Sequence, residues 1–491
     1  MKGALMVCGT GSDAGKSSLV AGLCRSLHRR GVRVAPFKAQ NMALNSYVTA
    51  GGHEIGRAQA AQALAAGTVP AVDMNPILLK PTGERTSQVV VLGRPTGELD
   101  AARYHTAKTG LRDVVLSSLG RLRSDFDVVV MEGAGSPAEI NLLDADLANL
   151  WLAGASGAPA VMVGDIERGG VFASLYGTVA ILPDDLAGRI KGFVINKFRG
   201  DPELLAPGLD ALTARTGIPT LGVVPWTAGL DLDAEDSLAL PGPNLSAPAA
   251  DEVLDVAVLR LPRISNFTDF DALAAEADVT VRFVDRPGAL GRPDLAVIPG
   301  TKATVADLAW LRERGLPDAL RGCLAAGGTV LGICGGYQML GQWIDDDVES
   351  GQGKVPGLGC LPVHTTFEAT KVTRQRRGRA GDQAVSGYQI HHGRTSPVTK
   401  PWIHLDDNEG DGAVGAGGAV VGTTLHGLFE SDGFRAAFLA EVAQRRGKTR
   451  RPSGLSFDAM RQRRFERLAD LVDTHLDTDA IDALIAQATP P

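Results

Sequence analysis

The stretch that decides the fold of the first half of the chain is Gly9–Ser18, GTGSDAGKSS. It follows a short apolar run, Ala4–Cys8, and precedes a segment in which apolar residues recur at helical spacing from Leu19 onward. A strand, a glycine-rich turn and a helix in this order can cradle phosphate, because the N–H groups of the turn face an anion at the start of the helix. The residues that we expect at this nucleotide site are Gly9, Thr10, Ser12, Asp13, Ala14, Gly15, Lys16, Ser17 and Ser18.

Two side chains of this loop carry most of its expected chemistry. Lys16 is placed to reach the terminal phosphates of ATP, and the hydroxyl of Ser17 stands where a Mg²⁺ ligand belongs. Five residues separate Gly9 from Gly15, instead of the four of the common phosphate loop. The loop is therefore longer than the usual pattern, but the Lys-Ser pair and the strand–helix context still favour a nucleotide site.

Length and composition indicate a soluble protein of more than one domain. The chain has 491 residues, more than one hydrophobic core usually serves. Its net charge of −7 shows no basic excess that would favour nucleic acid as a partner. No apolar run has the length of a membrane span, and the glycine-rich loop begins before a signal peptide could develop. Five cysteines without a Cys-x-x-Cys pair argue against a disulfide framework and a zinc site, so we expect a cytoplasmic protein.

Residues 1–235 alternate short apolar runs with helical patterns, which is typical of a mostly parallel sheet covered by helices. We therefore predict an α/β fold with a phosphate-loop domain over this range. The expected strands are Ala4–Cys8, Val32–Phe37, Asp127–Glu132, Pro159–Asp165, Ile190–Asn196 and Thr220–Val224. Ligands of such sheets bind beyond the carboxyl ends of the strands, so the residues that follow each run are candidates for the site.

Polar residues follow several of these strands, as a pocket for a nucleotide and an anionic substrate requires. Lys38, Gln40 and Asn41 follow the second strand, and Asn196 ends the fifth. Glu132 closes the run VVVM, where phosphate-loop enzymes place a second Mg²⁺ ligand or a residue that holds water. Asn and Gly are also common turn residues after a strand, so a structural role is the alternative for each position except Glu132.

The second half of the chain begins after a proline-containing linker, residues 236–252. Residues 253–440 read as a second α/β unit. Its expected strands include Leu254–Leu261, Val279–Asp285 and Leu295–Pro299.

Two further regions carry no predicted chemistry. Apolar residues at three- and four-residue spacing predict helices from Phe434 onward, and we expect the helical extension, residues 441–491, to cap the second domain. Basic residues gather in a glycine-containing stretch that we interpret as a solvated loop. They are Arg374, Arg376, Arg377 and Arg379.

Residues 328–341, GTVLGICGGYQMLG, hold the second reactive feature. An apolar run meets small residues around Cys334 and then a helical pattern, which is the arrangement of a nucleophile elbow. A free cysteine more often packs as a small hydrophobic side chain. That interpretation applies to the remaining cysteines, which are Cys8, Cys24, Cys323 and Cys360.

A thiol nucleophile needs a base, and His426 is the best placed of the nine histidines because it follows a continuous apolar run. His391 and His392, in SGYQIHHGRT, compete for the role. Backbone N–H groups at Gly300, after the strand LAVIP, and at Gly335 are expected to stabilise an oxyanion.

Together the two halves resemble the cobyric acid synthases, glutamine-dependent amidotransferases of cobalamin biosynthesis. The motifs that carry the resemblance, in the order of the family, are GTGSDAGKS, VAPFKAQNMALNS, EIGRAQAAQA, MEGAGSPAEINL, GDIERGGVFAS, INKFRGD, IPGTKAT, GICGGYQMLG and LHGLFE. The first half is similar to dethiobiotin synthetase, whose glycine loop has the same extended spacing. The second half resembles class I glutamine amidotransferase domains of the cobalamin type. The wider class carries a triad acid two positions after the histidine, where this chain has Leu428, and Glu430 is not assigned to that role.

The resemblance implies a substrate, adenosylcobyrinic acid a,c-diamide, whose b, d, e and g carboxylates become amides with one ATP and one glutamine for each. It implies that ATP converts each carboxylate into an acyl phosphate, and that ammonia released from glutamine by Cys334 and His426 displaces the phosphate. We expect contacts near the γ-phosphate and the substrate carboxylate from Lys38, Gln40 and Asn41. Asn196 is expected near the adenine, and whether two chains form a homodimer stays open.

Other assignments share parts of this pattern. Cobyrinic acid a,c-diamide synthase and, more distantly, CTP synthase have the same architecture, but the KAQNM run with EIGRAQ after it favours the cobyric acid synthases. A partitioning ATPase of the deviant phosphate-loop type carries a lysine early in the loop, where this chain has Thr10, and it has no appended cysteine domain. A corrinoid is therefore the expected small-molecule partner.

Overall fold

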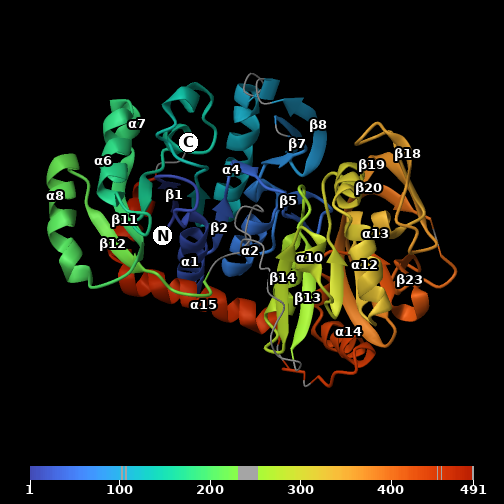
Figure 1. Cartoon of the computed structure of the whole chain (residues 1–491). Helices are drawn as coiled ribbons and strands as arrows, with labels where there is room; N and C mark the ends of the chain where they lie inside the picture. The colour runs from blue at the N-terminus through green and yellow to red at the C-terminus, as the bar shows by residue number, and fades with distance from the viewer. Residues whose placement is uncertain are drawn as a thin grey trace. The chain divides into compact units, whose positions relative to one another are not determined.

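The structure of the chain is a computed structural model that describes residues 1–83, 85–100, 103–104, 108–230, 253–396, 398–450, 452–454 and 456–488. The chain forms two compact units, whose elements are drawn in Figure 1. Unit 1 contains Met1–Ala43, Ile55–Asp233 and Arg461–Pro491, and unit 2 contains Leu44–Glu54 and Ala234–Met460. Each unit thus combines segments that lie far apart in the sequence. The predicted linker lies outside the described residues.

The centre of unit 1 is a six-stranded parallel sheet in the order β12-β11-β10-β1-β9-β2. Its strands are β1 (Gly3–Gly9), β2 (Val34–Phe37), β9 (Val128–Glu132), β10 (Ala160–Asp165), β11 (Ile190–Phe198) and β12 (Thr220–Pro225). Every strand expected here from the sequence is present, with small shifts at the ends, and the predicted α/β fold is confirmed. Because β1 lies inside the sheet, the loop after it stands at the edge where ligands of such sheets bind.

Alternate residues of the central strands are buried on both faces of this sheet. In β1, Met6 and Cys8 pack into one core and Leu5 and Val7 into another, and none of the four is more than 1% exposed. Burial on both sides explains why these strands read as continuous apolar runs. The Leu5 face is covered by α1 (Lys16–Arg29), α15 (Phe457–His475) and α16 (Thr478–Gln487). The Met6 face is covered by α4 (Arg112–Asp125), α5 (Leu150–Ala155), α6 (Val171–Ile181) and α8 (Ala206–Thr216), and α7 (Asp184–Ala187) lies at its margin.

The helix α14 (Asp432–Arg445) belongs to unit 2, but α15 from Arg461 onward and α16 belong to unit 1, so the prediction that these last helices cap the second domain is wrong. Figure 1 shows α15, in red, running beside α1. Gly22 of α1 permits this approach, because a Cβ there would meet the carbonyl oxygen of Leu468 at 2.7 Å. Arg25 pairs with Glu466 at 2.5 Å although 441 residues separate them. Helical periodicity shows which face of a helix is apolar, but it does not identify a partner so distant in the chain.

A smaller sheet of unit 1 follows the order β3-β6-β7-β8. Its strands are β3 (Gln40–Met42), β6 (Ile77–Pro81), β7 (Thr86–Val91) and β8 (Arg94–Asp100). α2 (Arg57–Ala65) lies between β3 and β6 in the chain. This sheet could not be predicted from the sequence, because a strand as short as β3 does not show the alternation of apolar and polar residues by which strands are recognised.

Unit 2 also has a six-stranded sheet, in the order β14-β13-β15-β16-β24-β23, which is parallel except for the edge strand β23. Its strands are β13 (Leu254–Leu259), β14 (Val279–Val284), β15 (Leu295–Ile298), β16 (Thr329–Ile333), β23 (Ala413–Gly415) and β24 (Val420–Thr423). Its helices are α9 (Asp271–Ala274), α10 (Pro287–Leu290), α11 (Thr304–Glu313), α12 (Leu316–Ala325), α13 (Gly335–Leu340) and α14 (Asp432–Arg445). The predicted second α/β unit is therefore confirmed.

A second sheet of unit 2 contains a long hairpin. Its strands are β17 (Trp343–Asp346), β18 (Gly353–Pro356), β19 (His364–Ala380), β20 (Gln383–Thr395), β21 (Ile403–Leu405) and β22 (Gly410–Asp411), and β4 (Ser46–Val48) pairs separately with β5 (Glu54–Gly56). The arginines from Arg374 to Arg379 lie on β19, so their interpretation as a loop is wrong, although Arg374, Arg377 and Arg379 are exposed to solvent. The side chain of Arg376 is only 9% exposed and pairs with Asp407 and Glu409. A strand stabilised by ion pairs lacks the apolar alternation by which strands are recognised.

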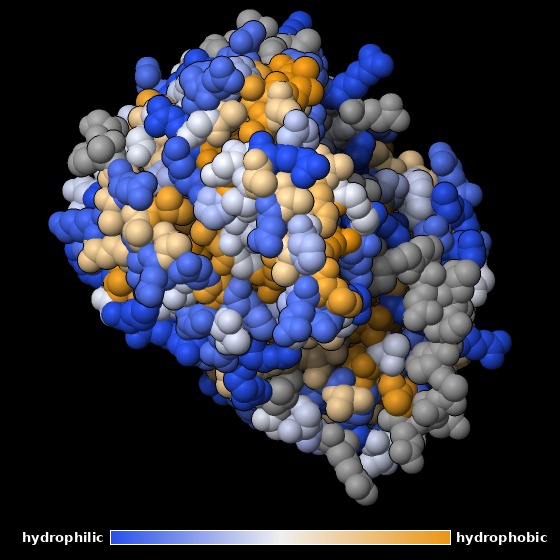
Figure 2. Space-filling view, turned by 90° about the vertical axis from the view of Figure 1, so that its left-hand side faces the viewer, coloured by the Kyte–Doolittle hydropathy of each residue, from blue (hydrophilic) through white to orange (hydrophobic). Residues whose placement is uncertain are grey.

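The surface of the face that carries α6 and α8 shows hydrophobic residues scattered among hydrophilic ones (Figure 2). Large hydrophobic residues exposed on unit 1 include Tyr176, Ile181, Leu204 and Trp226. Such scattered residues are ordinary on protein surfaces and do not mark a binding face. Among the described residues, no helix is both long and apolar enough to cross a membrane.

Candidate functional site

The glycine-rich loop of unit 1 lies between β1 and α1, at the carboxyl edge of the parallel sheet. Asp13 and Gly15 have positive φ values of 58° and 92°, which turn the backbone before α1 begins at Lys16. The ammonium of Lys16 donates to the carbonyl oxygens of Gly11 at 2.8 Å and Gly135 at 3.1 Å. Lys16 is thus held over the loop, where the phosphates of a nucleotide would lie.

Glu132, at the end of β9, is the centre of a buried cluster of polar side chains. Its carboxylate accepts hydrogen bonds from Ser17 at 2.8 Å, Lys38 at 2.9 Å and Gln62 at 2.5 Å. Burial alone would raise the pKa of Glu132, but the charge of Lys38 and the hydrogen bonds of these side chains outweigh it, so the pKa lies below its usual value. The carboxylate therefore stays charged at neutral pH beside the loop.

The oxygen atoms around Glu132 fit a hard divalent cation such as Mg²⁺. The hydroxyl of Ser17 and the carboxylate of Glu132 are 2.8 Å apart, and Oε1 of Gln62 is buried without a hydrogen-bond partner. Mg²⁺ prefers oxygen ligands and usually takes only a few from the protein, with phosphate and water supplying the rest. Within the described ranges, no group of three or more His, Cys, Asp or Glu side chains could hold a metal by itself.

Asn196 and Lys197, in β11, hold the loop from another side. The amide of Asn196 donates to the carbonyl oxygen of Ala14 at 2.9 Å. Lys197 has a φ of 61°, and its ammonium donates to the carbonyl oxygen of Asp13 at 2.7 Å and pairs with Asp165 at 3.0 Å. Both residues thus support the loop backbone. An adenine contact for Asn196 stays a prediction. Lys197 directly follows the strand predicted over Ile190–Asn196, which marks it as a residue at the edge of the site.

Lys38, Gln40 and Asn41 are close in sequence but contact different partners. Lys38 belongs to the buried Glu132 cluster. The side-chain oxygen of Gln40 accepts a hydrogen bond from the hydroxyl of Tyr104 at 2.8 Å. The amide of Asn41 donates to Oε1 of Gln59, on α2, at 2.9 Å. The expectation that all three contact substrate or phosphate stays a prediction.

In unit 2, Cys334 stands at the turn between β16 and α13, with φ 50° and ψ −109°. A strained position of this kind presents a nucleophile at the end of a parallel strand. Glycine makes the turn possible, because a Cβ at Gly336 would meet the carbonyl oxygen of Ile298 at 1.9 Å. The structure therefore places Cys334 at the geometry of a nucleophile elbow.

The backbone segments predicted to bind an oxyanion lie close to this turn. A Cβ built on Gly335 would stand 3.3 Å from the backbone nitrogen of Thr301, and one built on Gly300 would stand 2.8 Å from Cε1 of His426. Gly300 and Gly335 thus border the space around the thiol and the imidazole. Their role in stabilising an oxyanion stays a prediction.

His426 connects Cys334 to a buried carboxylate. Its Nδ1 lies 2.7 Å from Oδ2 of Asp269, whose other oxygen accepts the N–H of Gly427 at 2.8 Å. Burial alone would lower the pKa of His426, but the charges of Asp269 and Cys334 and the hydrogen bonds to both raise it to about 10. A thiol, an imidazole and a carboxylate in this order can attack an amide carbon and protonate the departing amine.

Asp269 is a residue of this site that the sequence did not reveal. It lies on a short 3-10 helix, Phe267–Phe270, 157 residues before His426. The position where the wider class carries its acid, Leu428, is buried and apolar. No spacing rule could find Asp269, because it reaches the histidine only through the fold.

His391 and His392, on β20, are the alternatives for the base. Nδ1 of His391 contacts the carbonyl oxygen of Gly393 at 2.8 Å, and burial lowers the pKa of this histidine to about 3. Nδ1 of His392 contacts the carbonyl oxygen of Glu368 at 3.0 Å, and burial lowers its pKa as well. His426, by contrast, is hydrogen-bonded to the thiol of the nucleophile elbow.

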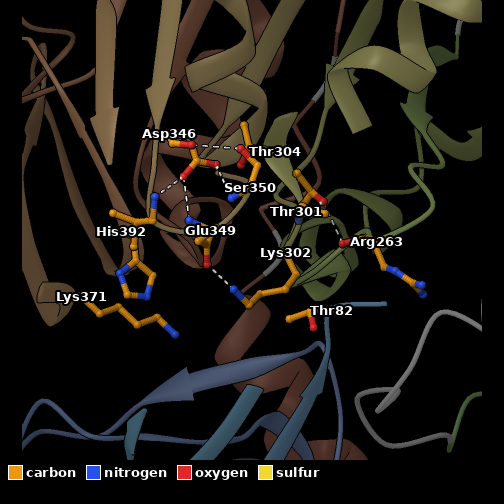
Figure 3. A network of polar contacts seen from close by, with 12 residues as sticks. Thr82, Arg263, Thr301, Lys302, Thr304, Asp346, Glu349, Ser350, Lys371 and His392 are labelled. Carbon is orange, nitrogen blue, oxygen red and sulfur yellow. Dashed lines mark hydrogen bonds and ion pairs between the residues drawn. The ribbon is translucent and has the colours of Figure 1, made fainter. Parts of the chain in front are cut away.

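A polar network lies beside the turn at 300–301 (Figure 3). Asp346 accepts the backbone N–H of Glu349 at 2.7 Å, which fixes the turn after β17. The carboxylate of Glu349 pairs with the ammonium of Lys302, and both side chains are largely buried. Figure 3 shows Glu349 between Lys302 and the ring of His392. Nε2 of His392 is buried and has no hydrogen-bond partner.

The remaining cysteines lie in hydrophobic surroundings. Burial raises the pKa of the Cys8 thiol to about 12 and that of Cys323 to about 11, and it also raises those of Cys24 and Cys360. Thiols with a raised pKa are poor nucleophiles at neutral pH. These environments fit a packing role.

Comparison with known proteins identifies both units. Residues 5–239 match the CobQ/CobB/MinD/ParA nucleotide binding domain, and residues 255–434 match the CobB/CobQ-like glutamine amidotransferase domain. The fold and the sites thus define a glutamine amidotransferase joined in one chain to a nucleotide-binding unit.

Similarity to whole proteins extends over the full chain. The cobyric acid synthase of Rhodococcus jostii (strain RHA1) is 54% identical over 497 residues, covering 100% of this chain and 96% of that protein. That of Nocardia farcinica (strain IFM 10152) is 53% identical over 509 residues, covering 100% and 98%. A solved glutamine amidotransferase is 18% identical, with a TM-score of 0.32, and covers 38% of this chain and 98% of its own. The chain belongs to the cobyric acid synthase family, whose members are glutamine-dependent amidoligases of cobalamin biosynthesis.

Proposed function

We propose that this chain uses ATP and glutamine to amidate the b, d, e and g carboxylates of adenosylcobyrinic acid a,c-diamide, giving adenosylcobyric acid. The observation that carries the proposal is the presence, in one chain, of a Cys334–His426–Asp269 triad and a phosphate loop beside Glu132. A carboxylate is a poor electrophile, so it must be activated before ammonia can attack it. Unit 1 supplies the activation and unit 2 supplies the ammonia.

Ammonia comes from the side-chain amide of glutamine. Sγ of Cys334 attacks the carboxamide carbon, and the negative charge on the oxygen is stabilised by the N–H groups of Gly335 and Gly300. His426 donates its proton to the departing nitrogen, leaving a thioester on the cysteine. Water activated by the same imidazole then cleaves the thioester and releases glutamate. Asp269 keeps the imidazole in the orientation and charge state that this cycle requires.

Activation takes place at the phosphate loop of unit 1. An oxygen of the substrate carboxylate attacks the γ-phosphorus of ATP, ADP leaves, and an acyl phosphate forms. Ammonia then attacks the acyl carbon, and inorganic phosphate departs. Lys16 and Lys38 lie where they can neutralise charge on the transferred group. Ser17 and Glu132 would hold Mg²⁺, which when bound neutralises phosphate charge.

The polar network beside the elbow suits the amino-acid end of glutamine. Nδ1 of His392 contacts a carbonyl oxygen and therefore carries the proton, so the unpartnered Nε2 is an acceptor. A zwitterion can enter between Lys302 and Glu349, with its carboxylate toward the lysine and its ammonium toward Glu349 and His392. Thr301, which precedes Lys302, adjoins the residue after Cys334. The α-amino acid group and the reacting amide would thus be bound on neighbouring segments.

Glu349→Gln is expected to raise the KM for glutamine about 10- to 100-fold, because a hydrogen bond to a charged group contributes about 1.5–3 kcal/mol. The variant should also lose discrimination against glutaramate, which is glutamine without its α-amino group. Glutaminase kinetics with both compounds measure these effects. Glu368→Gln, on an exposed side chain of the same unit, is the matched control. An unchanged KM and unchanged discrimination in Glu349→Gln would contradict the assignment.

The pH profile of glutamine hydrolysis should follow the imidazolium of His426. Its pKa of about 10 keeps the general acid protonated through neutral pH, so kcat/KM should fall only as the pH rises through about 10. Asp269→Asn removes the charge that raises this pKa, so its alkaline limb should move toward lower pH and its kcat should fall. Glutaminase rates measured against pH test both statements. An alkaline limb at the same pH in both proteins would show that Asp269 does not control His426.

The proposed reaction is tested by the identity of the corrinoid substrate and the number of amides formed. Purified protein is incubated with ATP, glutamine and one of two corrinoids, which are cobyrinic acid and its adenosylated a,c-diamide. The masses of the products are measured by mass spectrometry. We expect four new amides on the a,c-diamide. A reaction that stops after two new amides on cobyrinic acid would instead identify a cobyrinic acid a,c-diamide synthase.

A further inference from the structure

The segment Leu44–Glu54 lies within the nucleotide-binding half of the sequence but is part of unit 2. Three residues separate its Asn45 from Asn41, for which a contact near the substrate is predicted. The segment forms β4, turns at Gly52 with a φ of 75°, and returns to β5. Its buried side chains, none more than 3% exposed, include those of Asn45, Ser46, Val48, Thr49 and Glu54.

This segment holds the turn that carries the triad acid. The backbone N–H of Ser46 donates to Oδ1 of Asn266 at 2.8 Å, and the backbone N–H of Phe267 donates to Oδ1 of Asn45 at 3.1 Å. Asn266 has a φ of 53°, and its carbonyl oxygen accepts the N–H of Asp269 at 3.0 Å. These two hydrogen bonds therefore fix Asn266 and Phe267, with which the short 3-10 helix that carries Asp269 begins.

The same segment orients the aromatic ring beside the triad histidine. The hydroxyl of Tyr388 donates to the carbonyl oxygen of Ser46 at 2.9 Å. Its ring stacks on that of His426 with centroids 5.5 Å apart, and the two residues exchange backbone hydrogen bonds of 3.0 and 2.9 Å. Ser46 therefore contacts Asn266, which precedes the helix that carries Asp269, and Tyr388, whose ring stacks on His426.

Buried polar contacts anchor the segment within unit 2. Glu54 accepts the hydroxyl of Ser46 at 2.7 Å and pairs with Lys371 at 2.7 Å, and these two charged side chains are almost fully buried. Gln375, on β19, donates to the carbonyl oxygen of Val48. Removing one partner of such a buried pair is costly, so the segment has one well-defined arrangement.

We infer that Leu44–Glu54 is a positioning element of the glutaminase site, which holds Tyr388 and the helix that carries Asp269 in place for glutamine hydrolysis. The inference rests on the proposed function. Small displacements of catalytic groups change rates strongly. A shift of Asn45 or Ser46 would reach Asp269 through Asn266 and Phe267, and His426 through Tyr388. The groups that face the imidazole are Asp269, Cys334, Tyr388 and His391. Of these, the segment fixes Tyr388 itself and the turn that carries Asp269.

The test uses the full chain with Asn45→Ala and, separately, Tyr388→Phe, which removes one hydroxyl and keeps the stacked ring. Each variant is expected to lower kcat for glutamine hydrolysis about tenfold, with KM for glutamine changed by less than about twofold. The alkaline limb of the pH profile should move to lower pH. Amidation supported by ammonium should equal that of the parent. Ala50→Ser, at an exposed position of the same segment, is the control.

A measurement independent of catalysis separates this inference from the proposed function. The Nδ1 proton of His426, shared with Asp269, should give a downfield proton resonance in the parent that shifts or broadens in Asn45→Ala and Tyr388→Phe. A resonance and a kcat that both equal those of the parent, in both variants, would overturn the positioning role. So would an equal fall of glutamine- and ammonium-supported amidation, which would indicate a general loss of structure. If the parent hydrolyses no glutamine, the proposed function fails, and the resonance still decides whether the segment positions the triad.

Discussion

Replacing Cys334 with alanine is expected to lower glutamine-supported amidation at least about 1000-fold, because without the sulfur no thioester can form. Amidation supported by a high concentration of ammonium should stay within about twofold of the parent. The phosphate loop belongs to unit 1, whereas Cys334 belongs to unit 2, so the activating site keeps all its contacts. Alanine keeps the Cβ of cysteine, so the substitution adds no backbone strain at φ 50°.

Rates of corrinoid amide formation with glutamine and with ammonium, measured on the same preparation, check this prediction. Cys360→Ser is the matched control, since Cys360 is a half-buried cysteine of the same unit. Glutamine-supported amidation that survives in Cys334→Ala would show that the nucleophile lies elsewhere. Loss of the ammonium-supported reaction as well would show that the two half-reactions are not separable in the way proposed.

Replacing Lys16 with alanine should lower amidation about 100- to 1000-fold with either nitrogen source, because the variant loses the positive charge that we propose neutralises the transferred phosphoryl group. Basal hydrolysis of glutamine should persist, since the triad lies in unit 2. This pattern is the converse of that expected for Cys334→Ala. The pair of variants therefore assigns each half-reaction to its own unit.

ADP formation and amide formation, each measured with glutamine and with ammonium, check the effect of Lys16→Ala. Lys191→Ala is the matched control, because Lys191 is an exposed lysine of β11 in the same unit. Ammonium-supported amidation at the parental rate in Lys16→Ala would remove the phosphate loop from the mechanism.

The parallel sheets could be predicted from the sequence because their signals are local. Strands buried on both faces, such as β1 and β9, read as unbroken apolar runs, and the loop after β1 carries its glycines and Lys16 within ten residues. The turn at Cys334 is similarly local, since glycines on both sides of the cysteine make it possible. Positions of this kind depend on neighbours in the chain.

Features that depend on distant neighbours could not be predicted. Asp269 meets His426 across 157 residues, and α15 meets α1 across more than 400. Gln62, on α2, donates a hydrogen bond to Glu132. The motif EIGRAQAAQA that contains Gln62 can be recognised in the sequence, but this contact cannot. The segment 44–54 lies between residues of unit 1 in the chain but packs in unit 2. Its composition does not indicate that it packs in unit 2.

The central claim is that nitrogen released at Cys334 becomes the amide nitrogen of the corrinoid. The most direct measurement uses glutamine labelled with ¹⁵N in its side-chain amide, unlabelled ammonium as a competitor, and mass spectrometry of the corrinoid product. We predict four ¹⁵N amides on each product molecule from the parent chain, and unlabelled amides from Cys334→Ala. Product from the parent that carries mainly unlabelled nitrogen, or no new amide at all, would contradict the claim.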